Sequence, residues 1–192
     1  MNPITLYQFS KRLNVQIVPQ SNTVGGTYNS YIGGVLAPNG KIYFAPYNTS
    51  QILELNPTTN TTQLVGTAYS GYAKWSGGVL APNGKIYFAP YNASQILELN
   101  PTTNTTQLIG TTYTETTKWF GGVLAPNGKI YFAPHGASKI LELNPTTNTT
   151  QLVGSAYAEY DYKWAGGVLA PNGKIYFAPS IVTGKQIGRA HV

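Results

Sequence analysis

The chain is built from a unit of about 44 residues that returns almost unchanged. The segment GGVLAPNGKIYFAP begins at Gly33, Gly77, Gly121 and Gly166, which gives spacings of 44, 44 and 45 residues. The units that start at Gly33 and Gly77 differ at only two of 34 positions. Because a unit of this size cannot bury its own apolar side chains, the copies must stack on one another to form a core.

Each unit contains four short apolar segments separated by turn residues. We expect strands at residues 33–37, 41–46, 51–55 and 61–65, with the same pattern one and two periods later. Pro-Asn-Gly at residues 38–40 predicts a tight hairpin, since Asn and Gly accept the positive φ that such turns need. No window shows a clear 3.6-residue apolar period, and every connection contains Gly, Pro or Asn, so the pattern disfavours helical repeats.

Four strands in about 44 residues is the period of a β-propeller blade. Both faces of the strand at 42–45 are apolar, as expected where a neighbouring blade covers each face. The unit GGVLAPNGKIYFAPYNxSQILELNPTTNTT resembles repeats of kelch-like and YVTN-like propellers in uncharacterised microbial, algal and viral proteins, over residues 33–179. The predicted fold class is therefore all-β, an incomplete propeller ring of three full blades and part of a fourth. The resemblance implies a fold and no particular function.

The chain divides into three regions. Residues 1–32 form an N-terminal arm, in which we expect residues 13–18 to be an outer strand that closes the ring. Residues 33–179 hold the blades, and residues 180–192 depart from the repeat. Residues 186–192 match one translated frame of a sequencing-library adapter, so we predict that they are foreign to the natural protein, which continues into further blades.

Composition narrows the function classes. The net charge is +6, but charged residues are only 9% of the chain and form no basic stripe, which argues against nucleic-acid binding. There is no cysteine, hence no disulfide and no thiolate metal site. No signal peptide or membrane-spanning stretch is recognisable, so we expect a cytoplasmic or virion-associated protein.

The acidic residues do not form a catalytic pattern. The three that recur at one repeat position are Glu54, Glu98 and Glu142. If Pro46 pairs with Gln51, Tyr43 lies opposite Glu54 and Lys41 lies diagonal to it, which predicts cross-strand pairs that stabilise the sheet. A lone His135 in a turn has no partner in sequence that would make it a catalytic base. We therefore predict no catalytic residue, no metal site and no cofactor.

The most plausible binding surface is the face where the turn after the second strand meets the linker between blades. The candidate residues are Tyr47, Asn48, Tyr91, Asn92 and His135 from the turns, and Lys74, Trp75, Lys118, Trp119, Lys163 and Trp164 from the linkers. Aromatic rings stack on sugars and the polar groups supply hydrogen bonds. Each Trp has a competing role as a wedge between blades, whereas the lysines are expected to be exposed in either case.

These observations favour a non-enzymatic binding propeller whose ligand, a carbohydrate or a protein, lies on the linker face. One alternative is a lactonase-like or lyase-like enzyme whose active site lies in blades absent from this chain. Another is a structural repeat of a surface or phage-tail protein. Because the two ends of an open stack expose apolar faces, we also expect the chain to self-associate.

Overall fold

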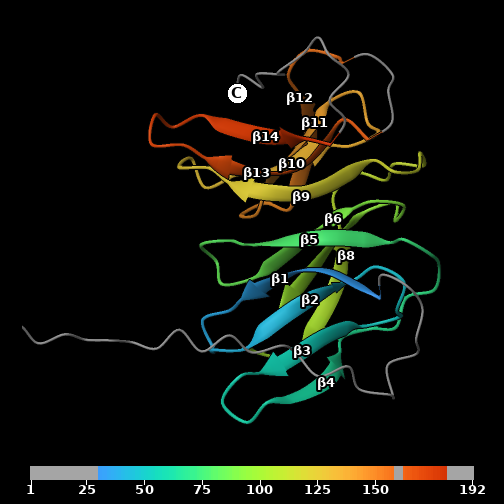
Figure 1. Ribbon diagram of the computed structural model, residues 1–192, viewed down its shortest axis with the longest axis vertical. Helices are drawn as coiled ribbons and strands as arrows, with labels where there is room; N and C mark the ends of the chain where they lie inside the picture. The colour runs from blue at the N-terminus through green and yellow to red at the C-terminus, as the bar shows by residue number, and fades with distance from the viewer. Residues whose placement is uncertain (1–29, 158–161, 181–192) are drawn as a thin grey trace, which may run out of the picture.

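The computed structural model describes residues 30–157 and 162–180, which contain fourteen strands and no helix (Figure 1). The first blade consists of β1 (Tyr31–Leu36), β2 (Ile42–Pro46), β3 (Ile52–Asn56) and β4 (Thr61–Val65). The second consists of β5 (Trp75–Leu80), β6 (Ile86–Pro90), β7 (Ile96–Asn100) and β8 (Thr105–Ile109). The third consists of β9 (Trp119–Leu124), β10 (Ile130–Pro134), β11 (Ile140–Asn144) and β12 (Thr149–Val153). The fourth contains β13 (Trp164–Leu169) and β14 (Ile175–Pro179).

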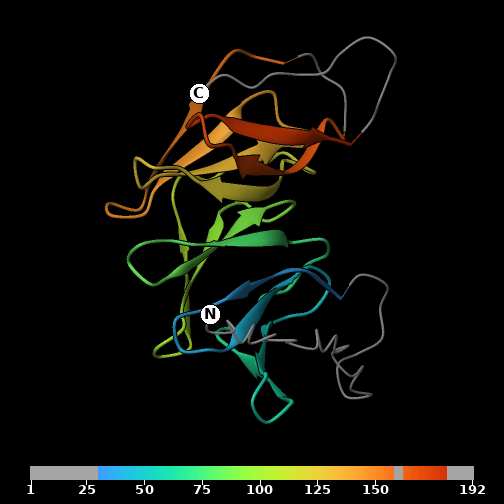
Figure 2. The same cartoon turned by 60° about the vertical axis from the view of Figure 1, so that its left-hand side comes forward.

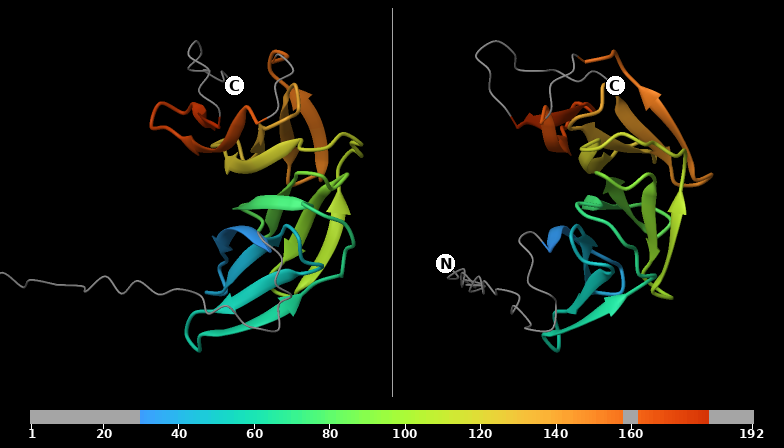
Figure 3. Two further views of the ribbon diagram at one scale, coloured as in Figure 1. Left: turned by 45° about the vertical axis from the view of Figure 1, so that its right-hand side comes forward. Right: turned by 90° about the vertical axis from the view of Figure 1, so that its right-hand side faces the viewer.

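Each full blade is an antiparallel sheet in which the strands pair in sequence order. The four predicted strands of each unit are therefore confirmed, with bounds shifted by one or two residues. The blades follow one another along an open arc, with the first strand of each blade on the inner side and the fourth strand at the periphery (Figures 2 and 3). The predicted ring-closing strand at 13–18 and the tail at 186–192 lie outside the described residues. No helix in the described ranges is long and apolar enough to cross a membrane.

The inner strands approach one another through glycine. Gly33 has φ 76° and lies against Gly77, where an added Cβ would come within 2.8 Å of the Gly77 Cα. The same contact joins Gly77 to Gly121. The pairing of β1 with β2 shifts register between Ile32 and Gly34, so these glycines form a bulge inside the strand. The prediction that the strand begins at Gly33 is therefore corrected to a start at Tyr31. Only a residue without Cβ permits this backbone and this contact.

The core lies between the blades. Each joint buries side chains from two faces, which we call the trailing face of one blade and the leading face of the next. At the first joint, the trailing face of the first blade contributes Val35, Tyr43, Ile52 and Val65. The leading face of the second blade contributes Trp75, Ile86, Phe88 and Leu97. Equivalent residues form the next two joints, so stacking buries both faces of the middle blades, as predicted.

The predicted turn chemistry is correct in part. Gly40 has φ 78° and its amide donates to the Ala37 carbonyl at 3.0 Å. Asn39 does not share the positive φ; its side chain accepts from the Lys41 amide at 3.0 Å and donates to the Tyr43 hydroxyl at 2.9 Å. In each full blade, the hairpin between the third and fourth strands instead has an asparagine with positive φ, as at Asn60 with φ 56°.

Candidate functional site

The turn after the second strand of one blade holds the linker to the next. The Asn48 Oδ1 accepts from the Ala73 amide at 2.8 Å, and Asn92 holds Thr117 at the same distance. Ala73 and Thr117 have φ of 49° and 53°, a left-handed conformation that is strained for residues other than Gly or Asn. The Tyr47 carbonyl accepts from the amide of the following Lys74 at 2.9 Å. The predicted turn and linker residues are thus brought together.

The expectation of exposed lysines is wrong for two of the three. Lys74 and Lys118 are 4% and 1% exposed. The Lys74 Nζ donates to the Gly71 carbonyl at 2.9 Å, and the Lys118 Nζ donates to the Glu115 carbonyl. Burial lowers the pKa of Lys74, and it lowers that of Lys118 to about 8 despite the nearby Glu115 carboxylate. Lys163 is half-buried and donates to a backbone carbonyl in the same way. These lysines therefore stabilise the linkers by hydrogen bonds to backbone carbonyls.

The tryptophans also lie inside the joints. Trp75 and Trp119 are each 2% exposed, and the indole Nε1 of Trp75 donates to the Gln95 carbonyl at 2.9 Å. The Tyr69 ring meets Trp75 edge-on, with the ring centroids 5.1 Å apart. Equivalent tyrosines meet the other two tryptophans, Tyr113 at Trp119 and Tyr157 at Trp164. These tyrosines were not among the predicted site residues, although they recur every 44 residues in linkers that otherwise vary.

The turn residues form a row of rings across the blades. Tyr47 and Tyr91 lie 5.5 Å apart between ring centroids, and Tyr91 lies 5.6 Å from His135. The row continues to Tyr162, 5.0 Å from His135. His135 is 6% exposed, and its Nδ1 is 2.8 Å from the Trp164 carbonyl oxygen. The imidazole is therefore packed as a member of the row.

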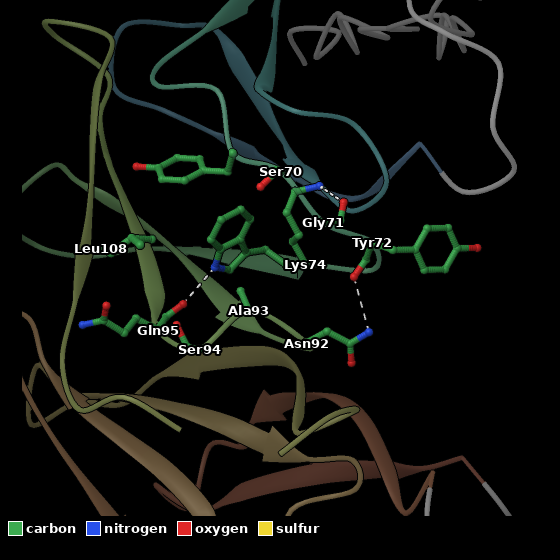
Figure 4. A pocket seen from close by; sticks show the side chains of 11 residues that line it. Ser70, Gly71, Tyr72, Lys74, Asn92, Ala93, Ser94, Gln95 and Leu108 are labelled. Atoms are coloured by element: carbon green, nitrogen blue, oxygen red, sulfur yellow. Dashed lines mark hydrogen bonds between the residues drawn. The ribbon is translucent and has the colours of Figure 1, made fainter. Parts of the chain in front are cut away.

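A pocket of about 390 Å³ opens where the first linker meets the second blade (Figure 4). Its apolar lining comes from Tyr69, Trp75, Ala93 and Leu108, and its polar lining includes Asn92, Ser94 and Gln95. In Figure 4, Lys74 turns its amino group toward Gly71, and the ring of Tyr72 points away from the other lining side chains. Polar and apolar atoms contribute about equally to its lining, and its volume lies within the range of about 300–1,000 Å³ that is usual for small-molecule sites.

The recurring glutamates accept hydrogen bonds within their own blade and from the next blade. Tyr43 pairs with Glu54 as predicted, and the Lys41 Nζ lies 2.6 Å from Glu54 Oε1. Asn104, from the next blade, donates to Glu54 Oε2 at 3.0 Å. Burial alone would raise the pKa of Glu54, but hydrogen bonds from Lys41, Asn104, Gln63 and Tyr43 lower it below its ordinary value.

The second blade repeats this arrangement at Glu98, with Lys85 at 2.7 Å and Asn148 at 3.0 Å. The predicted cross-strand pairs are confirmed, and the donor from the neighbouring blade extends them into a link between blades. Within the described ranges, no three His, Cys, Asp or Glu residues gather in a way that would hold a metal ion.

The comparisons bear on the fold. No family model and no curated protein matches the chain in sequence. Among solved structures, a catalytically inactive virginiamycin B lyase from Staphylococcus aureus, solved with quinupristin, matches 80% of this chain and 51% of its own, at TM-score 0.64 and 14% identity. A streptogramin B lyase matches 79% of this chain and 48% of its own, at TM-score 0.58 and 18% identity. The chain has a β-propeller fold.

An auxiliary nutrient binding protein from Bacteroides ovatus also matches, over 77% of this chain and 42% of its own, at TM-score 0.58 and 16% identity. This propeller therefore spans about half the length of the solved structures it resembles. The neighbours include lyases and a binding protein, so they support the propeller architecture and do not distinguish between these kinds of function. The kelch-like or YVTN-like subtype stays a prediction.

Proposed function

We propose that this propeller is a binding module that takes a carbohydrate in the pocket between a linker and the following blade. The observation that carries the proposal is the lining of that pocket, where the half-buried Tyr69 ring, packed edge-on against the buried Trp75, lies beside the polar groups of Asn92 and Ser94. Sugars present both apolar C–H faces and hydroxyl groups, so they need this combination. The volume of about 390 Å³ suits one or two sugar rings.

The repeat supports the same proposal. The edge-on contact of a linker Tyr with a Trp recurs at 5.1, 4.9 and 4.5 Å, so each linker is held in the same frame. Four of the six sequence differences between the first two linkers, residues 67–76 and 111–120, fall between these two fixed residues: Ser70 to Ala73 correspond to Thr114 to Thr117. Variable linker residues beside a constant Tyr–Trp pair are typical of a binding surface. Nearly identical sites on successive blades would recognise a repetitive ligand by multivalency.

A glycan array probed with the 192-residue chain tests the proposal, followed by titration of any hit while tryptophan emission is recorded. Binding should alter the emission, because Trp75 lines the pocket. Ser94→Trp adds a bulky ring at an exposed lining position and should weaken binding by about tenfold or more. Thr102→Trp places the same ring at an exposed position in the turn between the third and fourth strands, away from the pocket, and should leave binding unchanged.

Both variants should melt at the temperature of the parent, since neither position is buried. A silent array, or a hit that Ser94→Trp and Thr102→Trp weaken equally, would refute a carbohydrate site in this pocket. Binding to a protein with the same response to Ser94→Trp would keep the surface and replace the ligand class.

A further inference from the structure

The lysines of the repeat fall into two groups, which differ in the partner of the ammonium group. The lysine before the second strand of each full blade lies 2.6–2.7 Å from a glutamate carboxylate of the same blade: Lys41 at Glu54, Lys85 at Glu98 and Lys129 at Glu142. The Lys74 Nζ instead donates to the carbonyls of Gly71 at 2.9 Å and Tyr47 at 3.3 Å. Within residues 30–157 and 162–180, no carboxylate forms an ion pair with Lys74.

The charge of Lys74 is therefore buried without a counter-charge. The residue is 4% exposed, and burial lowers its pKa because the carbonyl groups replace only part of the hydration that an ammonium group has in water. An ammonium group has three N–H donors, and the two carbonyls accept two of them. The partner that stabilises such a group most is an anion, through a charge-assisted hydrogen bond.

The pocket at the first linker places a ligand beside this charge. The eleven residues that line the pocket include Lys74 and no aspartate or glutamate, so the net charge of the lining is +1 (Figure 4). The amino group of Lys74 is bonded to Gly71, which is itself an exposed lining residue, so the charge lies close to the rim. A site that is partly closed to water strengthens the attraction between a fixed charge and an anion.

The second linker supplies a carboxylate where the first has none. Glu115 stands at the repeat position of Gly71, and its charge raises the pKa of Lys118 against the larger effect of burial, which lowers it to about 8. Lys139 also replaces Gln95, so the charges at the equivalent positions sum to +1 at both linkers. The difference lies at the rim, where a carboxylate at residue 115 repels an anionic ligand and a glycine at residue 71 leaves space for one.

We propose that the pocket of the first linker takes an acidic sugar, whose carboxylate binds beside Lys74 in the role that Glu115 has at Lys118. This inference rests on the carbohydrate site proposed above and names the class of sugar. A uronate keeps the C–H face that packs on Tyr69 and the hydroxyl groups that the polar lining bonds, and it adds one negative charge. The second linker should not share the preference, since Glu115 already lies on its rim.

Fluorescence titration of the 192-residue chain with matched acids and esters tests the charge alone. The probes are short oligomers of galacturonate, glucuronate and mannuronate, each compared with its methyl ester, which keeps the ring and loses the charge. At least one acid should bind about tenfold more tightly than its ester at about 20 mM NaCl, as expected for one charge-assisted hydrogen bond. The ratio of the two affinities should shrink at about 0.5 M NaCl, because salt screens the attraction.

Two pairs of variants assign the preference to Lys74. Lys74→Met keeps a long side chain and removes its charge, so the affinity for the acid should fall to that for the ester. Lys174→Met is the control, since it makes the same change of net charge at an exposed position outside the pocket lining, and it should keep the ratio of the parent. Ser70→Glu places a carboxylate on the exposed rim and should lower the ratio, whereas Ser70→Gln, of similar size, should keep it.

The outcomes separate this inference from the proposed function. Equal binding of acid and ester in all three pairs overturns the acidic ligand and leaves a carbohydrate site in place, whereas a failure of every acidic and neutral sugar to bind overturns both. A preference that folded Lys74→Met retains would also overturn the inference. So would an equal loss in Lys174→Met, which would attribute the preference to the net charge of the chain. Circular dichroism and the melting temperature show whether Lys74→Met is folded, and if it is not, the two Ser70 variants decide.

Discussion

Replacing Gly77 with alanine tests the idea that glycine sets the spacing of the blades. Gly77 has φ 61°, and a Cβ there would come within 2.8 Å of the Gly121 Cα on the neighbouring inner strand. Both atoms belong to backbone, so no side chain can rotate to relieve the contact. The strands must separate by several tenths of an ångström, which disturbs the packing of the whole joint.

Two costs add at this position. An alanine with left-handed φ costs about 1–2 kcal/mol, and overpacking of a close contact costs about 1–3 kcal/mol more. Gly77→Ala should therefore lower the free energy of unfolding by about 2–5 kcal/mol. Gly166 occupies the same repeat position with φ 64° and nothing within 4 Å, and Gly84 has φ 77° with equally open surroundings. Gly166→Ala and Gly84→Ala should each cost about 1–2 kcal/mol, because they pay for conformation alone.

Urea unfolding at low protein concentration, followed by the fluorescence of the tryptophans at the joints, provides the free energies. The difference between Gly77→Ala and the two controls isolates the contact between inner strands. If all three substitutions cost the same, the close approach of the glycines contributes nothing and the stacking is set elsewhere. Gly84→Ala is the second control because Gly166 lies in the fourth blade, where fraying could hide the cost of the substitution. Gly84 lies in the second blade and avoids that problem.

Two further predictions concern buried charge. Glu98→Gln removes the ion pair with the partly exposed Lys85 and weakens the link to Asn148, so it should cost about 2 kcal/mol at pH 7 in urea unfolding. Because the native pKa of Glu98 is lowered, this stabilisation is present above the ordinary value of 4.5 and is lost as pH falls through the native pKa, so parent and variant should converge in acid. Lys118→Met should raise stability at pH 7, because burial lowers the native pKa of this lysine to about 8. The stability of the parent should rise relative to the variant between about pH 8 and 10.5, where the unfolded chain binds more protons; an advantage of Lys118→Met that does not change over this range would contradict the burial argument.

The blades were predictable because their signals are local and repeated. The positions of turns and the two-sided apolar strands fix four strands per unit, and the pairing of Tyr43 with Glu54 follows from the hairpin between them. The donor from the next blade, Asn104, lies 50 residues from Glu54 in sequence. No local pattern indicates that contact; it requires knowledge of how far one blade is rotated against its neighbour.

The linkers were predicted less well, for a different reason. Lysine in a polar linker is usually exposed, and that expectation failed at Lys74 because the linker folds back over its own side chain. The left-handed backbone at Ala73, held by Asn48, makes this fold-back possible, and alanine gives no sign of such a conformation. The fixed spacing of Tyr69 and Tyr113 was visible in the sequence and could have indicated a constant frame.

The constant residues of the repeat are largely committed to stacking. Trp75 and Lys74 are buried within the joint and linker, and Glu54 is held between blades. What distinguishes the first two linkers is therefore mainly the short stretch between the linker Tyr and Lys, which reads Ser-Gly-Tyr-Ala in the first linker and Thr-Glu-Thr-Thr in the second. A glycine at Gly71 and a carboxylate at Glu115 give the two rims different charge over the same frame. If the linkers bind a ligand, the constant Tyr and Trp should set the kind of ligand, and these four residues should set the preference of each linker.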